Sequence, residues 1–439
     1  MKTINADKVR NTIAEHMLAD GLEPVIDLQK SHGSWFVDQR NGREYLDLFS
    51  MFASMPIGYN HPHVLEHAES LKKAAINKPT NSDIYSTEMA EFVDTMSTIA
   101  QPSYLPYSFY ISGGALGVEN ALKAAFDWKV RRNIQKGNGE LGSQVIHFHG
   151  CFHGRTGYTL SLTNSHDPRK TMYFPQFKWP RITAPSLKFP LNDESIEAVK
   201  KLEQQAIEEI KEAINANLND IAALIIEPIQ GEGGDNHFRT EFMQELRTIC
   251  NENEIMLIFD EVQTGIALTG KMWAHEHFGE HARPDMICFG KKTQVCGFFA
   301  SKWIDEVENN VFHESARLNS TWGGNIVDMV RFKLYLEVIR NENLIENAVK
   351  SGEYLNQKIV ELENEFPDII SNARGKGLFC AFDLETGDKR DKLRNLIEEE
   401  GAIMLGCGAH TIRFRPPVNI STDEIDKGIE IIRRAIKRF

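Results

Sequence analysis

The chain has 439 residues, of which 41% are apolar and 25% charged, as expected for a globular protein with two or three domain-sized units. Its 62 acidic residues outnumber 49 basic ones, and the net charge of −13 disfavours general binding to nucleic acid or to an anionic membrane. No apolar run approaches the roughly 20 residues that span a bilayer, and the first residues lack the apolar core of a secretory signal. Six scattered cysteines without a CxxC pair predict reduced thiols and a cytoplasmic location.

Strand and helix patterns alternate along most of the chain. A helix is expected at the start, ending near Ala19, and a hairpin follows from the strands 35–38 and 44–47. Five short apolar runs, separated by helical patterns, come next: 108–111, 144–148, 222–226, 255–259 and 286–289. This alternation predicts an α/β fold with a mostly parallel sheet covered by helices on both faces.

The last third of the chain has a different character. Helices are expected at 326–341 and 345–366, after an acidic amphipathic helix at 197–216, and a strand–helix–helix tail is expected at 377–384, 389–400 and 423–437. We therefore predict a large central domain over 76–330. A smaller α+β domain would be built from both ends of the chain, 1–75 and 331–439.

Polar residues that follow the apolar runs are the candidates for chemistry, because open α/β sheets bind ligands beyond the carboxyl ends of their strands. Asp260 follows one run, and Lys291 follows another after Gly290. Gly113 and Gly114 open a helix whose backbone N–H groups could bind an anion. A pyridoxal phosphate (PLP) site needs an acid that holds the pyridinium nitrogen, a lysine that forms an imine and a turn that binds the phosphate. The combination of these three features predicts such a site.

Each feature alone has a simpler explanation. The glycine turn could be an ordinary connection, and Asp260 could form a structural salt bridge or a helix cap. A nicotinamide-dependent oxidoreductase is disfavoured because GxGxxG is missing, and a non-catalytic binding protein because an acid and a lysine lie at the sheet end. His147, His149 and His153 raise the question of a metal, but without HExxH we interpret them as packing and loop residues and predict no metal site.

Six motifs, in this order and spacing, resemble the class III, ω-type, PLP-dependent aminotransferases. They are IIEPIQGEGG (225–234), FDEVQTG (259–265), PDMICFGK (284–291), STWGGN (320–325), RGKGL (374–378) and IRFRPP (412–417). The resemblance extends from about Trp35 to the C-terminus. It implies a fold of type I, with a large PLP-binding domain and a smaller α+β domain.

The resemblance implies how five residues would hold the cofactor ring. Lys291 would carry PLP covalently and move the proton during the reaction. Asp260 would pair with the pyridine nitrogen, and Gln263 would contact the ring hydroxyl. Val262 and Phe152 would stack on opposite faces of the ring.

The phosphate site departs from the family pattern. Gly114 and Ala115 would donate backbone hydrogen bonds, but the usual Ser-Gly-(Ala/Thr)-Glu-Ala turn is replaced from Gly113 to Gly117, with loss of a serine hydroxyl. Thr321 would reach the phosphate of a neighbouring subunit. The resemblance thus implies a homodimer with composite active sites.

The substrate residues follow from the same resemblance. Arg413 would bind the carboxylate of 2-oxoglutarate or glutamate, and Glu232 would mask Arg413 when another substrate is bound. Arg155 would bind the α-carboxylate of lysine, and Asn319 would line the pocket.

Four further sequence segments are most similar to those of the family members that act on the ε-amine of L-lysine. They are FSMFAS (49–54), GCFHGRTGYTLSLTN (150–164), FGKKTQVCG (289–297) and LNSTWGGN (318–325). With 2-oxoglutarate as acceptor, the products would be 2-aminoadipate 6-semialdehyde and L-glutamate. An ornithine or 4-aminobutyrate aminotransferase remains the alternative, since pocket residues and not the fold decide the substrate.

Two neighbouring positions also depart from the family. Met51 and Phe52 replace a common Gly-Ile pair and are expected to narrow one wall of the substrate pocket. Lys292, next to Lys291, is expected to be a surface charge whose field would lower the pKa of Lys291.

Overall fold

A computed structural model describes residues 4–439 and contains a seven-stranded sheet in the order β3-β11-β10-β9-β6-β4-β5. The strands are β3 (Tyr107–Ile111), β4 (Gln144–Phe148), β5 (Arg181–Ile182), β6 (Ile221–Ile226), β9 (Met256–Asp260), β10 (Met286–Phe289) and β11 (Cys296–Ala300). Neighbouring strands are parallel except at β11, which is antiparallel to both β3 and β10. The prediction of a mostly parallel sheet is therefore confirmed.

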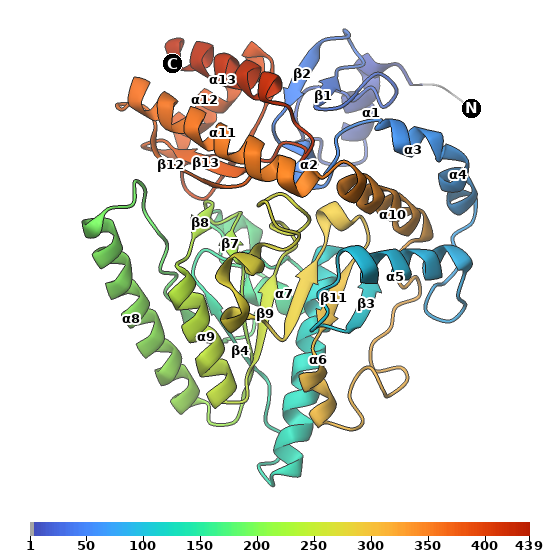
Figure 1. Ribbon diagram of the computed structural model, residues 1–439, viewed down its shortest axis with the longest axis vertical. Helices are drawn as coiled ribbons and strands as arrows, with labels where there is room; N and C mark the ends of the chain where they lie inside the picture. The colour runs from blue at the N-terminus through green and yellow to red at the C-terminus, as the bar shows by residue number, and fades with distance from the viewer. Residues whose placement is uncertain (1–3) are drawn as a thin grey trace.

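Helices cover both faces of this sheet, which explains why its strands are continuous apolar runs (Figure 1). On β9, Met256 and Ile258 belong to the same apolar cluster as residues of α6 (Gly114–Gln135). The alternate residues Leu257 and Phe259 pack with residues of α8 (Asp193–Ala216) and α9 (Thr240–Glu252). The two-residue period of a strand thus separates one core from the other.

Both ends of the chain meet above the large sheet. The hairpin strands β1 (Trp35–Val37) and β2 (Glu44–Asp47) are antiparallel, as expected, and β2 also pairs in parallel with β14 (Ala402–Ile403). An antiparallel sheet follows from β12 (Ser371–Lys376), β13 (Phe379–Asp383), β16 (Thr411–Phe414) and β15 (Leu405–Cys407). Figure 1 shows β1 and β2 beside α12 (Gly387–Glu400) and α13 (Thr422–Lys437).

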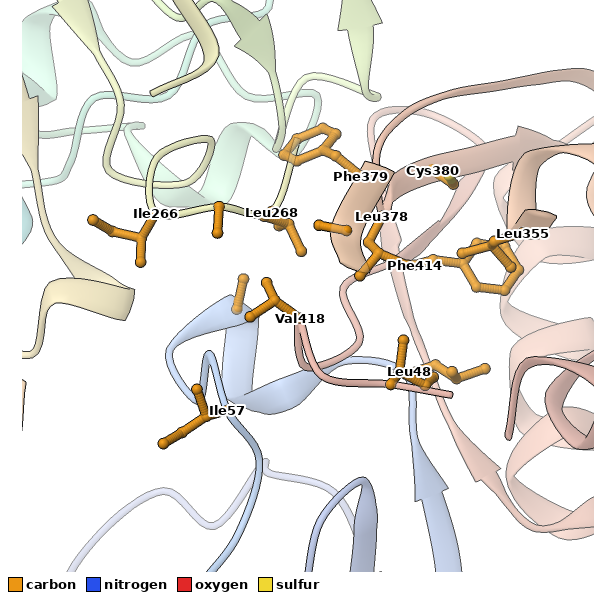
Figure 2. Close-up of a cluster of buried hydrophobic side chains, with 14 of the residues drawn as sticks. Leu48, Ile57, Ile266, Leu268, Leu355, Leu378, Phe379, Cys380, Phe414 and Val418 are labelled. Carbon is orange, nitrogen blue, oxygen red and sulfur yellow. The ribbon is translucent and has the colours of Figure 1, made fainter. Parts of the chain in front are cut away.

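One apolar cluster joins these parts of the chain (Figure 2). It combines Leu48 and Ile57 of the N-terminal segment with Leu268 of a loop after β9. Phe414 of β16 and Val418 complete it from the C-terminal segment. This shared core fixes β16, and with it the arginines of the IRFRPP motif, against the edge of the large sheet.

The remaining elements connect these layers. They are α1 (Val9–Ala14), α2 (Ser50–Ala53), α3 (Pro62–Glu66), α4 (Ala68–Ile76), α5 (Thr87–Ile99), α7 (Gly157–Leu162), α10 (Ile326–Asn341), α11 (Leu344–Glu365) and the two-residue strands β7 (Ile229–Gln230) and β8 (Asn236–His237). Among residues 4–439, no helix is both long and apolar enough to cross a membrane.

The expected N-terminal helix is shorter than predicted. It ends at Ala14, and the prediction that it continues to Ala19 was wrong. Arg10 donates hydrogen bonds to the carbonyl oxygens of Ala19 and Leu22, so the chain folds back along the helix. Met17 and Leu18 are exposed, and therefore no apolar face supports further helical turns.

Candidate active site

The carboxyl ends of β4, β6, β9 and β10 lie at one edge of the sheet, and a cavity of about 270 Å³ opens there. Its lining comprises Gly114, Ala115, Phe152, His153, Gly154, Arg155, Glu227, Glu232, Asp260, Val262, Gln263 and Lys291. Most of the site residues predicted from sequence thus come together, although they are spread over nearly 180 positions of the chain. Asp260 ends β9, and Lys291 follows the neighbouring strand β10 after Gly290, as the sheet-end argument expects.

Asp260 is buried and has two partners. The backbone N–H of Val262 donates to its Oδ1 at 3.0 Å, and Nδ1 of His153 lies 2.8 Å from its Oδ2. Burial by itself would lower the pKa of the His153 imidazole, but Cys151 and Asp260 raise that pKa well above its usual value. These two contacts hold the Asp260 carboxyl group in a fixed orientation at the cavity wall.

Lys291 occupies a strained position directly after β10. Its backbone has φ of 53°, in the left-handed region that non-glycine residues rarely adopt. Burial lowers the pKa of its amine to about 8, with further lowering by Arg413 and Arg415. A neutral, nucleophilic amine is consequently accessible near physiological pH.

This pKa can be measured through cofactor uptake by the apoenzyme. Only the neutral amine attacks an aldehyde, and about 10% of the amine is neutral at pH 7 if its pKa is 8, against about 0.03% for an ordinary lysine. We expect the rate of covalent PLP uptake to rise with pH to a plateau above about 8. Arg413→Met should move the midpoint upward, and a rate that still increases tenfold per unit at pH 10 would contradict the assignment.

Lys292 differs from the prediction. It is buried, and its Nζ donates to the carbonyl oxygen of Gln263 at 2.5 Å, so the prediction of a surface charge was wrong. Burial and then the neighbouring Lys291 lower the pKa of Lys292 well below its usual value. The cations that lower the pKa of Lys291 are Arg413 and Arg415.

The start of α6 has the free backbone donors that an anion site requires. Backbone N–H groups in the first turn have no acceptor within the helix, and no side chain of the described residues caps it. Gly113 has φ of 106°, and a Cβ on Gly114 would lie 3.1 Å from Cγ1 of Val262, so glycine suits both positions. The loop that carries Phe152 is tied to α6, since Thr156 and the backbone N–H of Tyr158 donate to Glu119 at 2.6 and 2.9 Å.

Gln263 is oriented by a buried ion pair. Arg415 binds Asp235 with both terminal nitrogens, at 2.8 and 2.5 Å. The same guanidinium donates to Oε1 of Gln263 at 3.1 and 2.9 Å. With the amide oxygen engaged, the NH2 group of Gln263 is the part left to donate to a ligand oxygen, which is the role implied for it.

Glu232 connects the cavity to two cations. Nη2 of Arg413 donates to its Oε2 at 3.2 Å, and Nζ of Lys170 donates to its Oε1 at 2.6 Å. Burial by itself would raise the pKa of Glu232, yet Arg413 and Lys170 lower it. Glu232 and Arg413 are thus paired in the structure, as the predicted masking of Arg413 requires.

A second cavity, of about 320 Å³, adjoins the first, because Glu232 lines both. Arg413, Lys170 and Phe52 also line this outer cavity. Phe52, which was expected to narrow a substrate wall, therefore faces the outer cavity rather than the inner one. It lies in a left-handed turn with φ of 60° and packs edge to face on Phe49.

Three neighbours of the site were not predicted. His153 directly follows Phe152, which was predicted to stack on the ring. Glu227 directly follows β6, so the sheet-end rule identifies the position of Glu227 but not its role. Glu227 accepts hydrogen bonds from the backbone N–H groups of Phe152 and Gly231 at 2.9 and 3.0 Å, and burial raises its pKa to about 7. Lys170 comes from a connection without any sequence signal.

Arg413 lines only the outer cavity, and two predicted residues lie apart from both cavities. Asn319 and Thr321 are exposed and are not among their lining residues. Thr321 was expected to serve the site of a neighbouring subunit, so its exposed position in one chain leaves that role a prediction. Within residues 4–439, no group of three or more His, Cys, Asp or Glu residues is arranged to hold a metal ion.

These residues fit PLP. A buried carboxylate, a lysine of lowered pKa and an uncapped helix start lie around a cavity large enough for a substituted aromatic ring. The α/β fold and this site define a PLP-dependent enzyme.

Comparison with known proteins gives the family. Residues 17–436 match the model described as aminotransferase class-III, and the chain belongs to this family of PLP-dependent transaminases. The L-lysine-epsilon aminotransferase of Mycobacterium tuberculosis is 49% identical over 435 residues, which are 98% of this chain and 95% of the relative. That of Streptomyces clavuligerus is 43% identical over 437 residues, 99% and 95% of the two chains.

More distant relatives and solved structures agree with this assignment. The 4-aminobutyrate aminotransferase of Dictyostelium discoideum is 32% identical over 452 residues, covering 99% of this chain and 88% of the relative. The crystal structure of lysine aminotransferase from M. tuberculosis in the internal aldimine form is 48% identical, with a TM-score of 0.96 over 99% of this chain and 100% of that one. The fold prediction is thereby confirmed over 99% of the chain.

Proposed function

We propose that this aminotransferase moves the ε-amino group of L-lysine to 2-oxoglutarate, giving 2-aminoadipate 6-semialdehyde and L-glutamate. The observation that carries the proposal is the Glu232–Arg413 pair beside Lys291, in a chain that is 43–49% identical to lysine ε-aminotransferases. The pair allows one site to accept two kinds of substrate. A substrate with a carboxylate near the reacting carbon binds Arg413, and a substrate without that carboxylate leaves Arg413 paired with Glu232. The six cysteines are free and buried, consistent with work in the reducing cytoplasm.

The residues of the site divide the work of transamination. When bound, PLP supplies an electron sink for the carbon that loses its proton. Lys291, whose amine has a pKa of about 8, would remove that proton from the substrate carbon and deliver it to the cofactor. Asp260 would pair with the ring nitrogen of the bound cofactor and favour its protonated form, while His153 holds Asp260 in place. Val262 and Phe152 line the cavity as flanking apolar surfaces.

The two substrates use the arginines differently. Lysine presents its far amine, so its α-carboxylate lies away from the reacting carbon, where the exposed Arg155 at the cavity wall can bind it. Glutamate presents its α-amine, and its α-carboxylate then takes Arg413 from Glu232. Its side-chain carboxylate would be bound by Arg155. A bidentate pair of arginine and carboxylate is strong enough to compete with the single contact of Glu232.

Half-reaction measurements test the substrate. In single turnovers followed by the cofactor absorbance, L-lysine should convert the cofactor faster than ornithine or 4-aminobutyrate. Glu232→Ala should slow the lysine half-reaction more than the glutamate half-reaction, because Arg413 then stays unpaired while lysine binds. The expected difference is roughly ten- to a hundredfold, the value of one charged hydrogen bond. Faster conversion by ornithine, or equal slowing of both halves, would contradict the proposal.

We also propose an obligate homodimer in which Thr321 binds the cofactor phosphate of the other subunit. Its exposed position and the family resemblance of STWGGN support this. Mixing Lys291→Ala with Thr321→Ala protein under exchange conditions should produce mixed dimers that have one site free of both substitutions. Each mixed dimer should have up to half of the activity of an unmodified dimer. Separate sites within each chain would give no recovery after mixing.

A further inference from the structure

Lys170 is the least expected contact of the site. It ends a short 3-10 helix, Pro168–Lys170, in the connection between α7 and β5. Its Nζ lies 2.6 Å from Oε1 of Glu232, while Arg413 binds Oε2 of the same carboxylate at 3.2 Å. Glu232 therefore bridges two cations, one through each oxygen.

The two cations differ in their surroundings. The side chain of Arg413 is 4% exposed and that of Lys170 is 24% exposed. Both line the outer cavity, whose wall Glu232 shares with the cofactor cavity. A carboxylate that releases Arg413 and stays on Lys170 thus remains at this shared wall and does not have to enter bulk solvent.

Masking of Arg413 requires a place for Glu232 during the other half-reaction. A partly buried carboxylate such as Glu232 is destabilised when it loses its only partner, and such a state would oppose binding of the dicarboxylate. Lys170 removes this difficulty because its contact with Oε1 is independent of Arg413. The Lys170 ammonium also lies 5.8 Å from the centre of the Phe152 ring, at the distance of a cation–π contact.

We propose that Lys170 is a positioning residue that retains Glu232 when the α-carboxylate of 2-oxoglutarate or glutamate occupies Arg413. The proposal deepens the proposed function and rests on its assignment of Arg413 to the dicarboxylate. Lys170 touches no substrate in this account. It acts through Glu232 and determines how readily the site changes from the amine donor to the dicarboxylate.

The test compares half-reactions of holoenzyme carrying Lys170→Met. Without Lys170, Glu232 depends on Arg413 alone, so a dicarboxylate must displace a tighter pair. The apparent dissociation constants of 2-oxoglutarate and glutamate should increase about tenfold, whereas that of the amine donor should change less than threefold. Rates at saturation should be retained, and Lys170→Arg should restore dicarboxylate binding. A fall in the saturating rate with both substrates would overturn the proposal in favour of a purely structural role.

A double-mutant cycle separates retention of Glu232 from general attraction of anions. In a Glu232→Gln background, Lys170→Met should have no further effect on 2-oxoglutarate binding, because no carboxylate is left to retain. An undiminished effect there would overturn the proposal. Lys178→Met, which removes an exposed charge from the same connection, is the matched control and should leave binding unchanged.

This test remains separate from that of the substrate. Glutamate and 2-oxoglutarate share a half-reaction that does not depend on which amine donor the enzyme uses. If lysine proves to be a poor donor, the proposed function fails while the comparison of Lys170 variants still gives its answer. If the apparent dissociation constants of the dicarboxylates do not change, the proposed role of Lys170 is wrong, while lysine remains the proposed donor.

Discussion

Replacing Lys291 with alanine is expected to abolish turnover and to leave protein that purifies without covalently bound cofactor. The residue supplies both the covalent attachment and the proton transfer, and proton transfer by a positioned base contributes typically 10²–10⁴-fold on its own. Three features distinguish Lys291 as that residue. They are its lowered pKa, its place in the cavity wall and its strained backbone after β10. Borohydride reduction of the native enzyme and peptide mapping should locate the cofactor on Lys291.

Lys292→Met is the informative companion variant. Lys292 is buried and bound to the carbonyl oxygen of Gln263, and methionine preserves most of its length. The variant should lose some stability, about 1 kcal/mol for one neutral hydrogen bond, and should retain the covalent cofactor. A reduced cofactor adduct on Lys292, or loss of covalent cofactor in Lys292→Met alone, would reverse the assignment of the two lysines.

The sequence predicted the central strands well because both faces of the sheet are covered. β4 and β10 have the predicted bounds, and β9 differs by one residue at each end. Helix starts were less accurate where a cap decides them: α8 begins at Asp193, earlier than expected, because Asn192 and Ser195 form a capping box. The antiparallel strand β11 was not predicted, because a short apolar run shortly after Lys291 does not indicate the direction in which it pairs.

The candidate site likewise contains features that local sequence rules predict and features that they do not. Asp260, Lys291 and the Gly114 turn follow from local rules about strand ends and helix starts. Contacts between distant segments do not follow from local rules. The burial of Lys292 depends on where the chain after β9 lies, and the contact of Lys170 with Glu232 joins residues 62 positions apart. A charged residue next to a reactive one was interpreted as exposed because lysine is rarely buried, and here the carbonyl of Gln263 compensates for that burial.

Asp260→Asn should have the second large effect on catalysis. The substitution preserves size but removes the negative charge that keeps a proton on the ring nitrogen, and it also removes one of the groups that raise the pKa of His153. We expect proton removal from the substrate to slow at least about a hundredfold, or about 2.7 kcal/mol in the barrier. Asparagine can still accept the hydrogen bond from the backbone N–H of Val262, so the fold and covalent attachment to Lys291 should be retained.

His153→Gln distinguishes charge from orientation at this acid. His153 touches Asp260 at 2.8 Å and acts on the ring nitrogen only through that carboxylate, so its replacement should cost less than that of Asp260 itself. Rates measured in single turnovers with lysine, together with the amount of cofactor reducible onto Lys291, separate slow chemistry from lost binding. If Asp260→Asn retains the native rate with full cofactor content, the charge of Asp260 is not what activates the ring. If His153→Gln is the slower of the two, the imidazole rather than the carboxylate is the group that acts on the cofactor.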